Sequence, residues 1–161
     1  MRFEQFKTGD AGPTASSAAH AQSFDACGSY LLHWMNPKTL KETASKKWGV
    51  FVKWCGSEAR AVEACTWGRG PLVQINSHMV GRANGKFKGG DIVYIHGKVA
   101  NKLESGRGWH AWESTVLHEL IHWARYKDRL NDGDVEVGQE FEQEAYGQHI
   151  ELTTEWFQGM P

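Results

Sequence analysis

The sequence contains no apolar run of the roughly 18–20 residues that a membrane-spanning helix needs. Residues 1–14, MRFEQFKTGDAGPT, include no apolar h-region, so we expect no secretory signal peptide. An excess of one charge sign is also lacking, because 18 Lys and Arg stand against 19 Asp and Glu. The formal net charge of −1 gives no broad electrostatic reason to bind nucleic acid. We therefore expect neither a membrane span nor a nucleic-acid partner.

Cysteine is scarce, and its three positions do not resemble a disulfide framework. Cys27, Cys55 and Cys65 cannot all pair within one chain, and no CxxC motif occurs. A cysteine zinc site is therefore not expected. We expect the three thiols to be core residues of a protein made in a reducing cytoplasm.

The sequence is rich in tryptophan and histidine, with eight of each. Its 161 residues, of which 40% are hydrophobic, suit one soluble globular domain covering residues 1–161. Within it, residues 1–28 are rich in Gly and other small residues and are expected to form a flexible or weakly helical arm. Tryptophans pair an apolar body with a polar tip, so some of the eight are expected to line a cleft.

The hydrophobic pattern predicts an α+β fold with a small antiparallel or mixed sheet. The expected elements are a helix at 39–48, a strand or buried helical turn at 49–54, a helix at 57–65 capped by Ser57, strands at 71–76 and 91–96, and two longer helices at 112–127 and about 135–152. Between the two strands, residues 81–90 (GRANGKFKGG) are predicted to be a polar loop.

The first of the two longer helices carries an HExxH motif, from His118 to His122. Residues four apart lie on one helical face, so His118 and His122 can bind one tetrahedral zinc ion from the same side. Glu119 lies about 100° around the helix and is placed to take a proton from the attacking water. These three residues are the predicted centre of a zinc site.

A catalytic zinc site needs a third protein ligand and an open fourth position. The second helix offers four glutamates, Glu136, Glu140, Glu142 and Glu144. Glu142 shares a helical face with Tyr146 and His149 at the edge of the predicted buried stripe, so it is the preferred third ligand. Glu144 borders the same stripe and stays open as an alternative.

Asp128 is a further alternative for the third ligand, six residues after His122. Peptidases that use this offset need a glycine midway so that the chain can turn back, and Arg125 stands there in this sequence. A helix that continues through Arg125 would carry Asp128 away from the metal.

These motifs resemble the zincin superfamily of metallopeptidases, and in particular its glutamate-zincin branch. Glu142 follows His122 by twenty positions and begins an ExxA pattern that ends at Ala145, as is common in that branch. Tyr146 stands where the branch often has an aspartate. The resemblance implies a zincin-like fold with an HExxH helix, a second helix that carries a ligand, and a single Zn²⁺ held by His118, His122 and Glu142.

A narrower resemblance is to bacterial metallopeptidase toxin domains of polymorphic and type VI secretion systems. It rests on residues 117–124 (LHELIHWA) and 138–147 (GQEFEQEAYG). It implies an antibacterial or anti-host effector that cuts a protein or peptide. Such an effector is made in the bacterial cytoplasm without a signal peptide, leaves through a dedicated secretion system, and is bound by a cognate immunity protein.

The resemblance also assigns roles in hydrolysis. Zinc would polarise the scissile carbonyl while Glu119 activates water, and the strand at 91–96 would pair with an extended substrate. Four residues are candidates for the oxyanion-stabilising donor, namely Tyr146, His149, His110 and Tyr94. Tyr146 is placed with Glu119 in the predicted catalytic set.

Two other functions stay open at the level of sequence. One is a lytic endopeptidase that cuts peptidoglycan cross-bridges, using the same zinc chemistry. The other is a non-catalytic binding domain in which a fourth protein ligand, His149 or Glu144, closes the zinc site.

Overall fold

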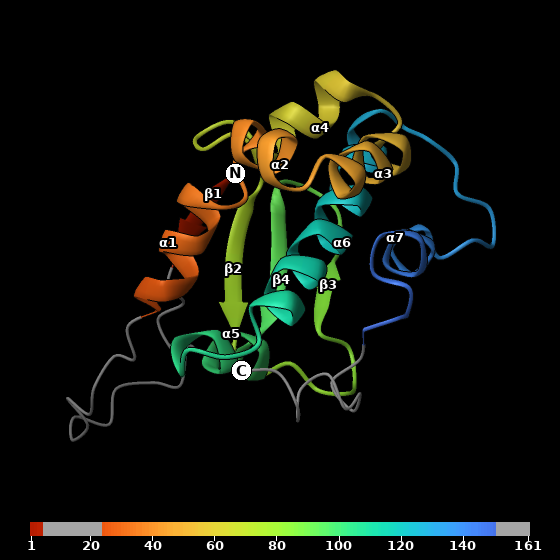
Figure 1. Ribbon diagram of the computed structural model, residues 1–161. Helices are drawn as coiled ribbons and strands as arrows, with labels where there is room; N and C mark the ends of the chain where they lie inside the picture. Colours follow the sequence, from red (N-terminus) through yellow and green to blue (C-terminus); the bar gives the residue numbers. More distant parts are fainter. Residues whose placement is uncertain (5–23, 151–161) are drawn as a thin grey trace.

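A computed structural model describes residues 1–4 and 24–150 of the chain, which form four strands and seven helices (Figure 1). In chain order the elements are β1 (Arg2–Glu4), α1 (Asp25–His33), α2 (Pro37–Thr43), α3 (Ser45–Cys55), α4 (Glu58–Cys65), β2 (Leu72–Asn76), β3 (Gly85–Phe87), β4 (Ile92–His96), α5 (Gly97–Glu104), α6 (Trp109–Lys127) and α7 (Val137–Tyr146). The expected α+β class with a small mixed sheet is confirmed.

The four strands form one sheet in the order β1-β2-β4-β3. The pairs β1·β2 and β2·β4 are parallel, with Val73 opposite Val93, whereas β3 runs antiparallel to β4, with Phe87 opposite Val93. The long helix α6 crosses one face of this sheet and contacts β3 and β4, while α7 packs beside α6 (Figure 1). The edge strand β3 and the helix α6 therefore lie next to each other.

The core forms where α6 meets the sheet. Alternate residues of β2 and β4 are completely buried, namely Val73, Ile75, Val93 and Ile95. Because neighbouring side chains of a strand point to opposite faces, this alternation directs one apolar row into the core. Helix α6 is buried along most of its length, and Trp112 and Trp123 are among its fully buried side chains. The helix that carries the HExxH motif thus also contributes a large part of the hydrophobic core.

Two strands lie where the sequence predicted none. Residues Gly85–Phe87, within the predicted polar loop, form β3, because this short segment pairs with β4 although it lacks the usual strand pattern. Residues Arg2–Glu4, within the predicted arm, pair with β2, and Met1 is fully buried. The first four residues are therefore not part of a free arm, and residues 5–23 of the predicted arm lie outside the described residues.

The helices match the sequence pattern in part, since α5 was not predicted and the predicted helix at 39–48 is divided between α2 and α3 at Ala44. Residues 49–54 are helical and belong to α3, and the Ser57 side chain caps α4 by accepting the N–H of Arg60. Helix α7 ends at Tyr146, earlier than predicted, because Gly147 adopts a left-handed conformation with φ of 79°. Residues 151 and 152, the last two of the predicted helix, lie outside the described residues.

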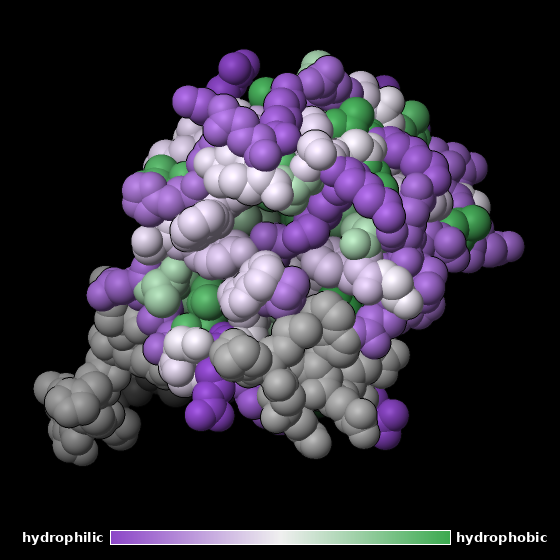
Figure 2. Space-filling view, viewed as in Figure 1, coloured by the Kyte–Doolittle hydropathy of each residue, from purple (hydrophilic) through white to green (hydrophobic). Residues whose placement is uncertain are grey.

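The three cysteines are buried and unpaired, as expected for core residues. Burial raises the pKa of the Cys65 thiol to about 12, so this thiol stays protonated and unreactive near neutral pH. Hydrophilic side chains predominate on the face seen in Figure 2, with apolar patches scattered among them. Within residues 1–4 and 24–150, no helix is long and apolar enough to cross a membrane.

Candidate metal centre and active-site cleft

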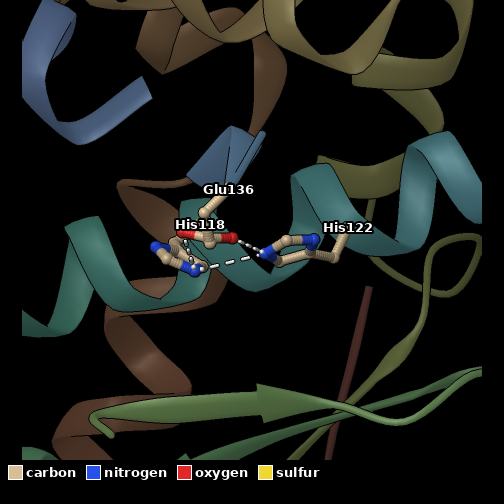
Figure 3. Close-up of side chains that lie close together, drawn as sticks. All are labelled: His118, His122 and Glu136. Atoms are coloured by element: carbon tan, nitrogen blue, oxygen red, sulfur yellow. Dashed lines mark hydrogen bonds and ion pairs between the residues drawn. The ribbon is translucent and has the colours of Figure 1, made fainter. Parts of the chain in front are cut away.

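Helix α6 directs the rings of His118 and His122 toward each other. Their positions one turn apart bring the two Nε2 atoms to 3.3 Å (Figure 3). Both rings are partly buried, with 18% and 26% of the side chains exposed. Two imidazole nitrogens at this separation form one edge of a potential metal site.

Glu136 completes a group of three. It stands at the N-cap of α7, where its carboxylate accepts N–H bonds from Gly138 and Gln139. From there its Oε1 lies 2.6 Å from Nε2 of His122, and its Oε2 lies 3.6 Å from Nε2 of His118 (Figure 3). Burial alone would raise the pKa of Glu136, but the two histidines and the N–H of Gln139 lower it to about 2. The carboxylate is thus held ionised against both rings.

The donor set fits a zinc ion. The ligand atoms of His118, His122 and Glu136 all lie within 4.8 Å of one another. In a tetrahedral zinc site with bonds of about 2.0–2.1 Å, two ligand atoms are about 3.3 Å apart, which matches the separation of the two Nε2 atoms. Two imidazole nitrogens and one carboxylate are also a donor set typical of catalytic zinc.

Glu142, the sequence-predicted third ligand, lies on the opposite side of the His118 ring. Its Oε1 is 2.8 Å from Nδ1 of His118, and its Oε2 accepts the backbone N–H of Ile150 at 2.9 Å. Burial lowers the pKa of His118, but the bond to Glu142 and the charges of Glu119, Glu142 and Glu136 outweigh it and raise that pKa to about 9. Glu142 is therefore placed to orient His118, and the side chain facing both Nε2 atoms is that of Glu136.

Glu119 lies beside the two histidines and is almost fully buried, with 3% of its surface exposed. Its Oε1 is 4.0 Å from Nε2 of His118, and its Oε2 has no hydrogen-bond partner among the described residues. Burial raises the pKa of Glu119 to about 7, although the charges of the two histidines oppose this shift. A carboxyl with a pKa near neutrality can both accept and return a proton, which is what a general base requires.

Two glycines allow the neighbouring backbone to approach the motif. A Cβ at Gly85, the first residue of β3, would lie 2.6 Å from Oε1 of Glu119. A Cβ at Gly138, in the first turn of α7, would lie 2.4 Å from the ring of His118. Both positions exclude larger residues, because the backbones of β3 and α7 lie in direct contact with side chains of the HExxH motif. The sequence shows two ordinary glycines here, and only the packing reveals their role.

A cleft of about 250 Å³ opens over this centre. Its lining combines one end of β3, the middle of α6, the start of α7 and the segment after α7, and comprises Arg82, Ala83, Asn84, Gly85, Thr115, His118, Glu119, Glu136, Gln139, Glu142, His149 and Ile150. His149 is the only one of the four proposed oxyanion donors among these residues. The sequence pattern gave no signal for Arg82, Asn84 or Thr115, because each is an ordinary polar residue until the fold gathers them.

Tyr146 does not line this cleft. Its hydroxyl donates to Oε1 of the buried Glu113 at 2.9 Å, and its ring faces the ammonium of Lys47. The phenol therefore holds α7 to α6 from the core side, and its position does not support the predicted catalytic role. Of the remaining predicted donors, His110 stacks on the neighbouring Trp109 and Tyr94 lies on β4, both outside the cleft lining.

The two alternative third ligands are both engaged elsewhere. Asp128 follows the end of α6 and accepts bonds from the guanidinium of Arg60. Glu144 is bonded to Lys53 at 2.6 Å and to the indole N–H of Trp54 at 3.0 Å. Neither carboxylate belongs to the group of potential metal ligands found among the described residues.

The predicted substrate-binding strand is placed differently from the expectation. Residues Ile92–His96 form β4, which is paired with β2 on one side and with β3 on the other. Both edges of β4 are therefore occupied, and it cannot accept another strand. The edge strand next to the cleft is β3, whose outer side has no paired strand within residues 1–4 and 24–150.

Comparison with known protein families identifies the family to which the chain is similar. Residues 20–147 match the family model described as metallopeptidase toxin 3, which covers most of the chain and all the residues of the candidate metal group. No curated protein and no solved structure matches the chain.

Proposed function

The chain belongs to the metallopeptidase toxin 3 family, and on that premise we propose that it is a zinc-dependent, zincin-like peptidase acting as a secreted toxin. The observation that carries this proposal is the group formed by His118, His122 and Glu136, with the buried carboxyl of Glu119 beside it. His118, His122 and Glu136 would hold the metal ion. Glu142 would position His118 through Nδ1, as carboxylates commonly do for metal-binding histidines.

A bound zinc ion would polarise the scissile carbonyl and make water acidic enough to react near neutral pH. The protein itself carries out the proton transfers, through the carboxyl of Glu119. Glu119 takes a proton from the attacking water as the new C–O bond forms, and it returns that proton to the amine when the C–N bond breaks. Its nearly complete burial keeps the carboxyl poised between its two protonation states.

The substrate is a protein or peptide, since a peptidase toxin acts on peptide bonds. An extended peptide would pair with the outer side of β3, which borders the cleft opposite α6. Arg82 and His149 line the same cleft, and the guanidinium and the imidazole can each donate an N–H to a developing oxyanion. They take the place of Tyr146 as candidates for this role.

The toxin assignment also implies a route and a partner. We propose that the protein acts outside the cell that makes it, after delivery by a dedicated secretion system of the type VI or a polymorphic class. In the producing cell, a cognate immunity protein would cover the cleft. An antibacterial target is proposed on the same basis.

The test is a comparison of wild type with Glu119→Gln and His122→Ala. Metal per chain would be measured by mass spectrometry, and hydrolysis would be measured with a mixture of fluorogenic peptides. Wild type should bind about one zinc and cleave peptides, Glu119→Gln should keep the zinc and lose cleavage, and His122→Ala should lose both. Full cleavage by Glu119→Gln would overturn the mechanism.

The same preparation separates the two other functions. Release of muropeptides from purified sacculi, without cleavage of proteins, would indicate a peptidoglycan endopeptidase. A zinc-stabilised binding domain with a closed site would hold zinc but would neither cleave peptides nor bind a hydroxamate.

A further inference from the structure

Three buried oxygen atoms in the cleft have no hydrogen-bond partner among the described residues. They are Oδ1 of Asn84, Oγ1 of Thr115 and Oε2 of Glu119, and all three residues line the cleft. Their residues are 7%, 2% and 3% exposed, respectively. Glu119 has a role as the general base, but catalysis as described above uses neither Asn84 nor Thr115.

Both residues lie near Glu119. Thr115 precedes Glu119 by one turn of α6, so both face the same side of the helix. Asn84 directly precedes Gly85, where the backbone of β3 comes close to the Glu119 carboxylate. The cleft lining beside Glu119 therefore includes an amide from the residue that precedes β3 and a hydroxyl from α6.

The hydrogen bonds already made by Asn84 fix what it can offer. Its Nδ2 donates to the carbonyl of Ile150 at 2.5 Å, so its Oδ1 remains as an acceptor. Its backbone carbonyl is occupied by the N–H of His96 at 2.7 Å. The side-chain oxygen is therefore left as an acceptor for a ligand, and a buried acceptor without a donor is destabilising.

The chemistry of the cleft limits which ligand groups can form hydrogen bonds with Oδ1 of Asn84 and Oγ1 of Thr115. A negatively charged carboxylate has no hydrogen-bond donor, so it cannot satisfy Oδ1 of Asn84. An aliphatic group would leave both oxygens unsatisfied, which disfavours it strongly. A neutral group with an N–H or O–H donor satisfies the oxygens without adding charge.

We propose that Asn84 and Thr115 form a specificity subsite for a substrate side chain that carries a neutral hydrogen-bond donor, such as Asn, Gln, Ser or Thr, next to the cleaved bond. The substrate main chain is needed at the edge of β3, whereas Thr115 is almost fully buried and is reached by a side chain. This inference rests on the proposed peptidase function and adds a substrate class to it.

The test is a cleavage profile of a random peptide library with the zinc-loaded full chain, read by mass spectrometry. Wild type should favour Asn, Gln, Ser and Thr over their aliphatic counterparts at one position flanking the cleaved bond. Thr115→Val keeps the shape but removes the hydroxyl, and should reduce that preference about tenfold, the effect of one neutral hydrogen bond. Thr115→Ser retains a hydroxyl and should retain the preference.

Ser114→Ala is the matched control. Ser114 is equally buried in α6, but its hydroxyl donates to the carbonyl of Ala111 within the helix, and it does not line the cleft. Its cleavage profile should equal that of wild type. An aliphatic preference in wild type, or an unchanged profile in Thr115→Val, would overturn the subsite; the unchanged profile would mean that ordered water satisfies Oγ1.

A binding measurement separates this inference from the peptidase function. Two dipeptide hydroxamates, one with a Gln side chain and one with the similarly shaped Met, would be titrated into zinc-loaded wild type and Thr115→Val by calorimetry. The Gln compound should bind more tightly to wild type, and this difference should shrink about tenfold in the variant, in which Asn84 remains as an acceptor. If wild type cleaves no peptide but discriminates between the compounds, the peptidase proposal fails and the subsite stands. Equal binding of the two compounds to wild type overturns the subsite.

Discussion

Oε1 of Glu142 lies 2.8 Å from Nδ1 of His118, on the side of the ring that faces away from the Nε2 atom of His122. The contact fixes the ring, because the second oxygen of Glu142 is held by the N–H of Ile150. Nε2 of His118 is thereby directed toward His122 and Glu136. Glu142 thus lies on the Nδ1 side of the His118 ring, and Glu136 lies on its Nε2 side.

This division predicts different effects on metal affinity. Glu136→Ala removes a carboxylate that faces both Nε2 atoms and should abolish tight zinc binding. Glu142→Gln leaves the metal-facing groups in place but weakens the orientation of His118, so zinc affinity should fall by about 10–100-fold. Competition titration with a chromogenic chelator measures both. Glu140→Gln, at an exposed position of the same helix, is the control. Loss of zinc in Glu142→Gln with retention in Glu136→Ala would reverse the assignment.

The close approach of Gly138 to His118 predicts that this glycine is required. In Gly138→Ala the new Cβ would lie 2.4 Å from the imidazole, so the ring or the start of α7 must move. We expect loss of zinc affinity and destabilisation of about 1–3 kcal/mol from overpacking.

Gly49→Ala is the matched control for that substitution. Gly49 lies inside α3, and a Cβ there meets nothing within 4 Å. It should stabilise the protein by about 0.5–1 kcal/mol, because alanine favours a helix over glycine. Urea denaturation compares the two variants. A Gly138→Ala protein that binds zinc like wild type would show that the site tolerates the displacement.

Substitution of Tyr146 should lower the stability of the protein but leave its turnover rate nearly unchanged. Tyr146→Phe removes the hydroxyl that donates to the buried Glu113, which also accepts bonds from Tyr30 and Lys47. The free energy of unfolding should fall by about 0.5–3 kcal/mol, within the range for a hydrogen bond to a buried charge. At a temperature where the variant is folded, its turnover rate should stay within about threefold of wild type, since the tyrosine lies outside the cleft lining. Normal folding combined with turnover slowed by about two orders of magnitude would restore Tyr146 as a catalytic residue.

The ion pair between Asp128 and Arg60 should make a contribution to stability that depends on pH. Hydrogen bonds from Arg60 hold the pKa of this carboxyl below its ordinary value of 3.8. A group whose pKa is lowered by folding stabilises the protein above its unfolded pKa, and that contribution disappears as the pH falls through the folded pKa. Asp128→Asn should therefore lower stability by less than about 1 kcal/mol at pH 7, because the pair is partly exposed, and the difference from wild type should vanish in strong acid.

Urea denaturation between pH 2 and pH 7 measures that difference, and metal content is measured on the same samples. Zinc binding by Asp128→Asn should equal that of wild type, since Asp128 pairs with Arg60 and not with the histidines. Loss of zinc in this variant would instead support Asp128 as the third ligand.

The sequence by itself determined the local part of the site. His118, Glu119 and His122 are held by one helix, so their spacing alone fixes their relative directions. The packed strands β2 and β4 were likewise predicted from the alternation of apolar residues, and Ser57 was predicted as a cap from its position before a helical pattern. In each case the signal lies within a few consecutive residues.

Tertiary structure alone decided the rest. Glu136 and Glu142 are both glutamates of the α7 region, and only the way α7 packs against α6 places one before and the other behind the His118 ring. Strand β3 exists because β4 offers it a partner, and its pattern in the sequence is that of a loop. Asn84 and Thr115 are 31 positions apart in the chain and meet in one cleft through that same pairing. Such contacts depend on the distances between elements, which local periodicity does not encode.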